Sequence, residues 1–369
     1  MIATDFSKIQ EQVASVDPVA YGKTRNFIDG AVTGLSPYIS RGVLSTKQVL
    51  QSVLARGYEP NRIEKFIQEL AWRDYWQQVW IDKGDLINQD LRRPQPNVQN
   101  HEMPQSIIEA KTGIQAIDDA IQSFYTTGYL HNHVRMYIAS VACNVGGSHW
   151  KTPAQWMYYH LLDGDWASNA LSWQWVSGAN AGKEYYANQE NINRYCYTKQ
   201  RNTFLDVDYS AFDHMKVPGE LQPTTKPSLT TTFPNPQPLN IDKSLPTLLY
   251  NWYNLDPSWH QGEDVNRVLL IEPSVFASYP ISQKSMNFMM KLAENIPGIQ
   301  LFVGEFDELE KGYAIENLVY KEHPLNNYHG TEEARDWMFT VTGYYRSFFA
   351  FWKKCQKELK QWNQPTLFG

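Results

Sequence analysis

The sequence predicts two unlike domains, a large all-α domain followed by a smaller α/β domain with a Rossmann-like parallel sheet. Before residue 215, apolar side chains recur at helical spacing and alternating strand patterns are scarce. After residue 246, short apolar runs flank one helix-length segment, which is typical of a strand–helix–strand unit. We therefore expect an all-α domain over 1–215, a Pro- and Thr-rich linker over 216–245, an α/β domain over 246–362 and a tail over 363–369.

The individual elements follow from the same patterns. Helices are expected over 60–83, 114–145 and 153–176, and a closing aromatic helix over 342–362. In the first of them, Ile63, Phe66, Ile67 and Leu70 recur at i, i+3, i+4 and i+7. The expected strands are 247–253, 267–273, 299–306 and 315–322, with a crossover helix over 282–296.

The composition excludes several classes of protein. With 33 basic and 39 acidic residues the net charge is −6, which excludes a strongly basic nucleic-acid wrapper but not a local basic patch. Cys143, Cys196 and Cys355 form no disulfide framework and no metal knuckle. There is no apolar signal segment and no membrane-spanning run. We expect a cytoplasmic protein with no bound metal and no membrane contact.

Two helical segments carry unusual polar patterns. Glu69, Trp72 and Arg73 share one face of the first helix, which is either a partly exposed edge with an ion pair or a binding face. His131 and His133 are two residues apart and would point in different directions on a helix, so we do not expect them to chelate a metal.

Two turns could also carry chemistry. In the segment DGDWASNALSWQW (163–175), Asp163 and Asp165 could bind a divalent cation, act as acid and base, or cap a helix. The segment TGLS (33–36) before Pro37 is either an ordinary helix start or a seat for an anion.

Together these motifs resemble the FAD-binding domain of the DNA photolyase and cryptochrome family. The resemblance covers roughly residues 20–200. The matching residues and segments, in order along the chain, are Tyr21, Arg25, 33–45, 69–76, 111–121, 127–136, Trp150 and 163–175.

The resemblance implies a noncovalently bound FAD inside the helical domain. The residues expected to bind it are Tyr21, Thr33, Leu35, Ser36, Arg73, Arg135, Asp163, Asp165 and Asn169. The first four would hold the diphosphate, with Arg73 close to the cofactor. Asp163 and Arg135 resemble the family's ion pair beside the flavin, and Asp165 the residue near the pyrimidine edge of its ring. Asn169 matches the residue that faces flavin N5, where an amide adds no negative charge beside a reduced flavin.

The resemblance also implies light-driven repair of cyclobutane pyrimidine dimers in DNA, including single-stranded DNA, by electron transfer from excited reduced FAD. The expected catalytic residues are Glu69, Trp72, Asn132, Met136, Trp175 and Asn169. Glu69 would hydrogen-bond the flipped bases and Trp72 would pack against them. The alternative is a photosensor of the same family that binds FAD without repairing DNA, and a third interpretation is a flavin-binding scaffold without photochemistry.

Several positions depart from the family pattern. Its tryptophan chain for electron transfer maps onto Trp173, Trp150 and a third place near Ile107, which cannot carry an electron. Photoreduction would then end at Trp150, or use another aromatic residue such as Trp156 or Tyr158. His133 replaces an arginine and Tyr129 replaces a tryptophan, which counts against tight DNA binding.

Two features of the second half of the chain lead to further hypotheses. They are the position of the α/β segment after the helical one and the sequence of the C-terminal tail. Family members begin with an α/β antenna domain, whereas here an α/β segment follows the helical one, so we expect either a circular permutation or an unrelated appended domain. The chain ends in QPTLFG, and Gln364, Leu367 and Phe368 resemble the bacterial sliding-clamp-binding peptide. Alternatively, this hydrophobic end packs on its own domain.

Overall fold

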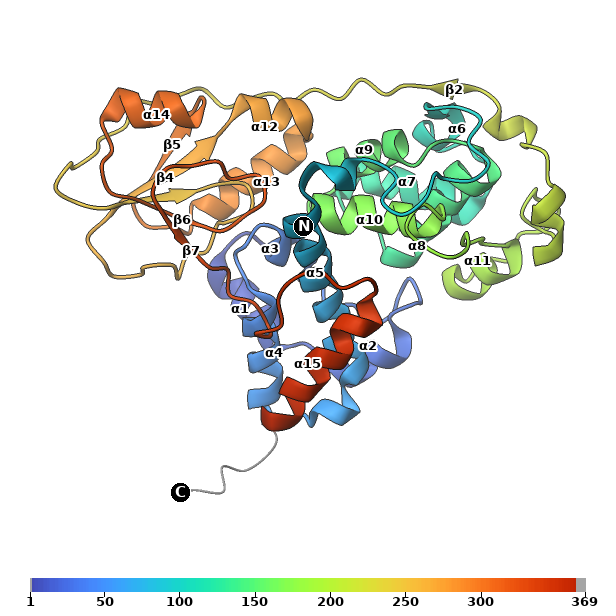
Figure 1. The fold of residues 1–369 in the computed structure, drawn as a ribbon. Coiled ribbons are helices and arrows are strands. Elements are labelled where there is room, and N and C mark those ends of the chain that lie inside the picture. Colours follow the sequence, from blue (N-terminus) through green and yellow to red (C-terminus); the bar gives the residue numbers. More distant parts are fainter. Residues whose placement is uncertain (1, 363–369) are drawn as a thin grey trace.

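The computed structural model describes residues 2–362, and the first half of the chain in it is built from helices (Figure 1). They are α1 (Phe6–Ala14), α2 (Pro18–Thr24), α3 (Ser36–Ser40), α4 (Thr46–Ala55), α5 (Glu64–Lys83), α6 (Gln105–Ile108), α7 (Gln115–Thr127), α8 (Asn132–Ala139), α9 (Lys151–His160), α10 (Trp166–Val176) and α11 (Gln189–Cys196). Short 3-10 turns (η1, Pro60–Arg62; η2, Gly84–Asn88; η4, Tyr209–His214; η5, Gly219–Leu221) and a π-helical turn (η3, Ser140–Val145) lie between or after them. A two-residue antiparallel ladder joins β1 (Met103–Pro104) to β2 (Thr224–Thr225).

Two of the expected long helices are each divided in two, which corrects the prediction. The segment 114–145 is interrupted after α7, where Gly128 adopts a left-handed conformation with φ 71° that closes the helix. The segment 153–176 is interrupted after His160, and Asp165 then caps the N-terminus of α10. Helical periodicity continues through both breaks, so the apolar pattern alone could not locate them.

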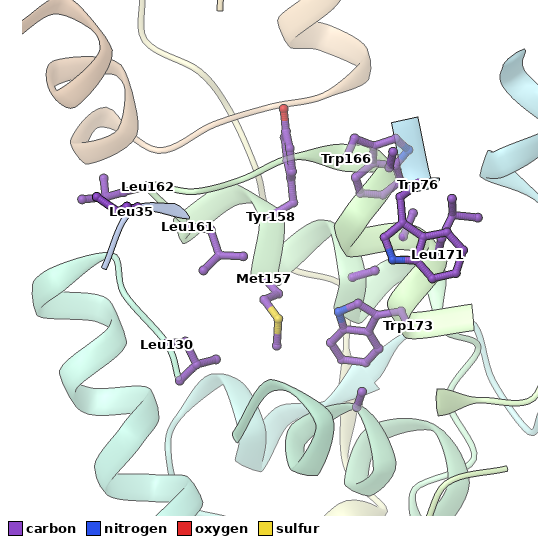
Figure 2. Close-up of a cluster of buried hydrophobic side chains, with 14 of the residues drawn as sticks. Leu35, Trp76, Leu130, Met157, Tyr158, Leu161, Leu162, Trp166, Leu171 and Trp173 are labelled. Atoms are coloured by element: carbon purple, nitrogen blue, oxygen red, sulfur yellow. The ribbon is translucent and has the colours of Figure 1, made fainter. Parts of the chain in front are cut away.

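A buried aromatic core lies where α9 and α10 pack together. Figure 2 shows Met157 and Tyr158 of α9 beside Trp166 and Trp173 of α10. All four side chains are buried, and the rings of Tyr158 and Trp166 meet edge to face at 5.4 Å between centroids. This packing fixes the turn between the two helices, which carries the DGD sequence.

The second half of the chain forms a five-stranded sheet in the order β5–β4–β3–β6–β7, with every neighbouring pair parallel. The predicted parallel sheet is therefore confirmed. The strands are β3 (Thr247–Tyr250), β4 (Asn266–Ile271), β5 (Ile299–Val303), β6 (Leu318–Lys321) and β7 (Thr331–Glu333). The edge strand β7 was not expected, because its sequence TEE has no apolar pattern.

Three helices accompany the sheet: α12 (Pro273–Ser278), α13 (Gln283–Ala293) and α14 (Phe306–Tyr313). The strand order reverses direction between β3 and β6, so the ends of these two strands form a topological switch point. Figure 1 shows the segment between η5 and β3 running extended from the helical part to the sheet.

The last helix, α15 (Phe348–Trp362), packs against α5 in the helical part (Figure 1). We had expected residues 246–362 as one α/β domain, but this helix lies outside the sheet layer. The segment that leads to α15, here called the strap (residues 334–347), runs along α5. The Asp74 carboxylate accepts hydrogen bonds from Met338 N at 3.1 Å and from Thr46 Oγ1 at 2.9 Å, and the Tyr75 hydroxyl donates to Tyr345 O.

Arg41 joins the helical part to the sheet. Its guanidinium is fully buried, stacks on the Trp252 ring 3.4 Å from the ring centroid, and donates to the Trp252 carbonyl. The same guanidinium donates to the carbonyl of Gly164 in the DGD turn. One side chain therefore connects the turn before α10 to the loop after β3.

No helix within residues 2–362 has both the length and the hydropathy needed to cross a membrane. The proposed clamp-binding residues Gln364, Leu367 and Phe368 lie outside the described residues, so that motif stays a prediction.

The contact between α15 and α5 can be tested with Phe348, which is 2% exposed and stacks on Trp72. Phe348→Ala should lower the free energy of unfolding by about 3–5 kcal/mol, because it removes a buried aromatic side chain. Chemical denaturation followed by tryptophan fluorescence measures this. Phe349→Ala is the control, since Phe349 is 69% exposed and its loss should change stability by no more than about 0.5 kcal/mol. Equal effects of the two substitutions would contradict the packing.

Candidate functional site

The sequence-predicted site residues of α3, α5 and the DGD turn lie in one hydrogen-bonded network. Ser40, the last residue of α3, donates from its hydroxyl to the Asp163 carbonyl at 2.8 Å. The same hydroxyl accepts from Arg73 Nη1 at 2.6 Å. The Arg73 guanidinium of α5 is thereby held between the end of α3 and the turn before α10. Sequence reasoning did not single out Ser40, although it lies within the 33–45 motif.

Arg135 and Asp163, the predicted ion pair, are in direct contact. Arg135 Nη2 donates to the two carboxylate oxygens of Asp163 at 3.0 and 2.9 Å, and Arg135 Nε donates to the Leu130 carbonyl. Burial of the Asp163 carboxyl opposes its ionisation, but Arg135 outweighs burial and holds the pKa of Asp163 below its ordinary value. The pair is therefore an ionised arginine–carboxylate unit inside the helical part.

Asp165 takes the helix-capping role that the sequence left open. Its Oδ1 accepts from Ser168 N at 2.7 Å, and its Oδ2 accepts from Gln77 Nε2 at 2.5 Å. The two carboxylates of the DGD turn thus differ in function, since Asp163 forms an ion pair and Asp165 starts α10.

Asn169 lies one turn after Asp165 on α10, and its amide has a defined orientation. Asn169 Nδ2 donates to the Ala154 carbonyl of α9 at 2.9 Å. The amide oxygen is consequently the group of this side chain that is left to accept a hydrogen bond. A neutral acceptor is therefore present on α10, the helix that follows the DGD turn.

The four residues expected at the diphosphate lie at the beginnings of α2 and α3. Thr33 Oγ1 accepts from Leu35 N at 3.2 Å, and Ser36 is the first residue of α3. Leu35 is buried, so it can contact a ligand only through its backbone or through the face that lines the interior. Tyr21 packs edge to face on Phe66 of α5, and burial raises its pKa.

The residues expected to contact the lesion are spread around α5, α8 and α10. Glu69 forms ion pairs with Arg25 at 3.4 Å and with Lys65 at 3.2 Å. Asn132 is exposed at the start of α8, and Met136 is half-buried one turn later. Trp175 at the end of α10 is 40% exposed.

Trp72, expected as the wall of the lesion pocket, has one ring face covered. The ring of Phe348 stacks on it with 3.8 Å between centroids and 10° between planes. Sequence reasoning missed this partner. The aromatic segment 342–362 predicted a helix, but not the surface that it covers. The residues that α15 buries are Phe348, Phe351, Trp352, Cys355 and Leu359.

A pocket of about 110 Å³, partly open to solvent, lies between the helical part and the ends of strands β3 and β6. Arg73 and Asp165 line it from the helical side, together with side chains after the two strands. Among these, His323 Nε2 and Asn254 Nδ2 are buried without a hydrogen-bonding partner, and burial lowers the pKa of His323 well below its ordinary value. Such unpartnered polar atoms beside a pocket suit a polar ligand or ordered water. No pattern in the sequence indicated this contribution from the sheet.

The donor set of the network suits FAD. The Arg73 guanidinium, which donates to Ser40 at the end of α3, is a suitable partner for an anionic part of the cofactor. The Asn169 amide oxygen can accept a hydrogen bond from a flavin ring N–H.

Comparison with known proteins gives the same assignment. Residues 66–206 match the family model described as the FAD binding domain of DNA photolyase. Over these residues the chain is therefore similar to the FAD-binding domain of the DNA photolyase and cryptochrome family. It is a flavoprotein, and its cofactor is FAD.

Two curated relatives and one solved structure illustrate the similarity. The chain is 33% identical over 165 residues to a deoxyribodipyrimidine photo-lyase of Thermus thermophilus, covering 43% of this chain and 38% of that protein. It is 29% identical over 195 residues to a cryptochrome DASH of Ostreococcus tauri, covering 50% of this chain and 34% of that one. A cryptochrome of Synechocystis sp. PCC6803 superposes with a TM-score of 0.47 and 24% identity, covering 52% of this chain and 43% of that one. The chain thus spans less than half the length of these photolyase-family proteins.

The ion pair beside the expected flavin position can be tested in the photolyase-like domain by stability. Arg135→Gln should cost about 3–5 kcal/mol at neutral pH, because it leaves the buried Asp163 carboxylate without a partner. Urea denaturation of the two proteins measures the difference.

The loss of stability caused by Arg135→Gln should depend on pH. In the wild type the folded pKa of Asp163 is depressed, so its stabilisation is present above the unfolded value of about 3.9 and is lost as the pH falls through the folded pKa. In Arg135→Gln, protonation of Asp163 relieves the penalty, so the difference between the two proteins should shrink in acid. The double variant Arg135→Gln/Asp163→Asn should recover part of the loss. A difference that is independent of pH, with no recovery in the double variant, would contradict the pairing.

Proposed function

We propose that this protein repairs cyclobutane pyrimidine dimers in DNA, using light absorbed by reduced FAD. The observation that carries the proposal is the orientation of Asn169, whose Nδ2 is engaged by the Ala154 carbonyl and whose amide oxygen is left as a neutral acceptor. A neutral group at this place does not oppose the negative charge of a reduced flavin, whereas a carboxylate would. Bound FAD supplies the excited-state electron for ring splitting.

The chain's own residues would position the cofactor. Tyr21, Thr33, Leu35 and Ser36 would hold the diphosphate. Arg73, whose guanidinium is held in place by Ser40, would lie close to the cofactor. The Arg135–Asp163 pair would lie beside the flavin and give it a fixed electrostatic environment. Asn169 would accept the hydrogen bond from flavin N5–H.

The lesion would lie against α5. Glu69 would accept hydrogen bonds from the flipped bases, and the Arg25 and Lys65 cations beside it would lie close to the DNA backbone. Because Phe348 covers one face of Trp72, the dimer would pack on the rest of that ring. The exposed Trp175 would form the opposite apolar wall.

A family photosensor without repair activity is the second candidate. It is favoured by the stacking of Phe348 on Trp72, because α15 then occupies part of the surface that a dimer would use. The two candidates differ in what light does. Reduced protein illuminated with dimer-containing single-stranded DNA should lose dimers if it is a repair enzyme and leave them intact if it is a sensor. Loss of dimers at the same rate in the dark would contradict both.

Glu69→Ala should lower repair per absorbed photon while FAD stays bound. Losing a hydrogen bond to a charged group costs about 1.5–3 kcal/mol, which corresponds to roughly a 10- to 150-fold loss. The quantum yield of dimer loss and the flavin absorbance measure the two quantities. Glu59→Ala removes an exposed carboxylate ahead of α5 and should leave both unchanged. An unaltered yield in Glu69→Ala would remove this residue from the lesion face.

Asn169→Asp should make flavin reduction harder by about 1–4 kcal/mol, which is the Coulomb energy of two charges near 4 Å between the limits of water and protein surface. Redox titration of the bound FAD measures the shift. The matched control is Asn287→Asp on the exposed side of α13, which adds the same charge to the sheet domain. A titration that does not distinguish the two variants would rule out the role proposed for Asn169.

A further inference from the structure

Trp150 donates a hydrogen bond to a carboxylate. Its Nε1 lies 2.8 Å from Asp90 Oδ1, and the Trp150 side chain is fully buried. Asp90 follows η2 in a loop that packs on the start of α9, and its side chain is 23% exposed. A buried indole N–H thus has a partly exposed acceptor that can carry a proton.

The other contacts of Asp90 are hydrogen bonds that its two carboxylate oxygens accept. Its Oδ1 also accepts from His149 Nε2 at 3.1 Å, and its Oδ2 accepts from Gln95 N at 2.8 Å. Lys151 N donates to His149 Nδ1, which leaves the ring hydrogen on Nε2, and burial lowers the pKa of His149 against the opposing pull of Asp90. The further charged or titratable groups near His149 are His101, whose ring centroid is 4.9 Å away, and the Lys151 ammonium.

We infer that Asp90 is the proton acceptor of Trp150 when this tryptophan is oxidised. The inference rests on the bound FAD of the proposed function and on the electron path expected from the sequence, in which Trp150 gives one electron through Trp173 toward the flavin. Loss of one electron leaves a radical cation whose N–H is a much stronger acid than that of the neutral indole. Transfer of the Nε1 proton to Asp90 Oδ1 leaves a neutral tryptophan radical and an uncharged carboxylic acid. Charge and atoms balance, since the electron has left along Trp173 and the proton has moved 2.8 Å or less.

The proton transfer from Trp150 to Asp90 matters because Ile107 stands where the family pattern has a third tryptophan. Ile107 is a buried aliphatic residue of α6, so no further donor lies at the place where a third tryptophan would refill Trp150. Without a proton acceptor, the electron would return quickly to a buried radical cation. With Asp90 protonated, its return also requires the proton, and the oxidised state lasts longer.

A flavin-free measurement tests the hydrogen bond. In apoprotein labelled with nitrogen-15, the indole N–H resonance of Trp150, assigned by its loss in Trp150→Phe, should lie downfield in the wild type and shift upfield in Asp90→Asn. Asp85→Asn, which removes an exposed carboxylate earlier in the same segment, should leave it in place. A Trp150 resonance that is unchanged in Asp90→Asn would overturn the inference.

Flash spectroscopy of the FAD-loaded protein tests the transfer itself. The wild type should form the neutral tryptophan radical, more slowly in D2O than in H2O. Asp90→Asn should lose this species, show the radical cation instead and recombine faster. Identical radical spectra and lifetimes in the two proteins would overturn the inference, and so would the absence of any tryptophan radical.

A repair assay distinguishes failure of the inference about Asp90 from failure of the proposed function. Protein reduced chemically beforehand does not use Trp150, so Asp90→Asn should repair dimers as the wild type does. If wild-type protein repairs no dimer while the radical species differ as expected, the repair proposal fails and the role of Asp90 stands. If repair occurs and the radical species are identical, the role of Asp90 fails and the repair proposal stands.

Discussion

The arrangement of the helical part and the sheet depends on the buried guanidinium of Arg41, which contacts both. It is fully removed from solvent, and its charge is compensated by carbonyl oxygens of Gly164 and Trp252 and by the face of an indole. The Gly164 contact fixes the DGD turn, and through it the Arg135–Asp163 pair and the first turn of α10. The loop after β3 is fixed by the same side chain, so the cofactor site and the sheet share one anchor.

Local pattern predicted the parts of the fold that depend on neighbouring residues. The periodicity of 60–83 predicted α5, and the strand–helix–strand texture predicted the parallel sheet. The breaks at Gly128 and at 161–165 were missed, because one left-handed glycine or one capping aspartate ends a helix without disturbing the apolar rhythm around it. The edge strand β7 was missed because backbone pairing to β6, and not its charged sequence, defines it.

In the candidate site, too, some contacts could be predicted from the sequence and others could not. The motifs around Arg135 and Asp163 predicted a pair that the fold does bring into contact. The stacking of Phe348 on Trp72 and the bond from Trp150 to Asp90 were not predicted, since each joins segments that no local pattern relates. The contribution of the β3 and β6 ends to the pocket also required the topology, because those strands are neighbours only in the folded sheet.

The strap has a mechanical consequence. The sheet is connected to the helical part by the extended segment before β3 at one end and by the strap at the other, and the strap is hydrogen-bonded to α5 through Asp74 and Tyr75. A chain tethered at both ends cannot swing about a single hinge, so relative rotation of the two parts would require breaking the contacts of one tether. For the same reason, a proteolytic nick in residues 226–245 would leave the sheet in one fragment with the strap and α15, and the non-covalent contacts of these two with α5 would hold the fragments together.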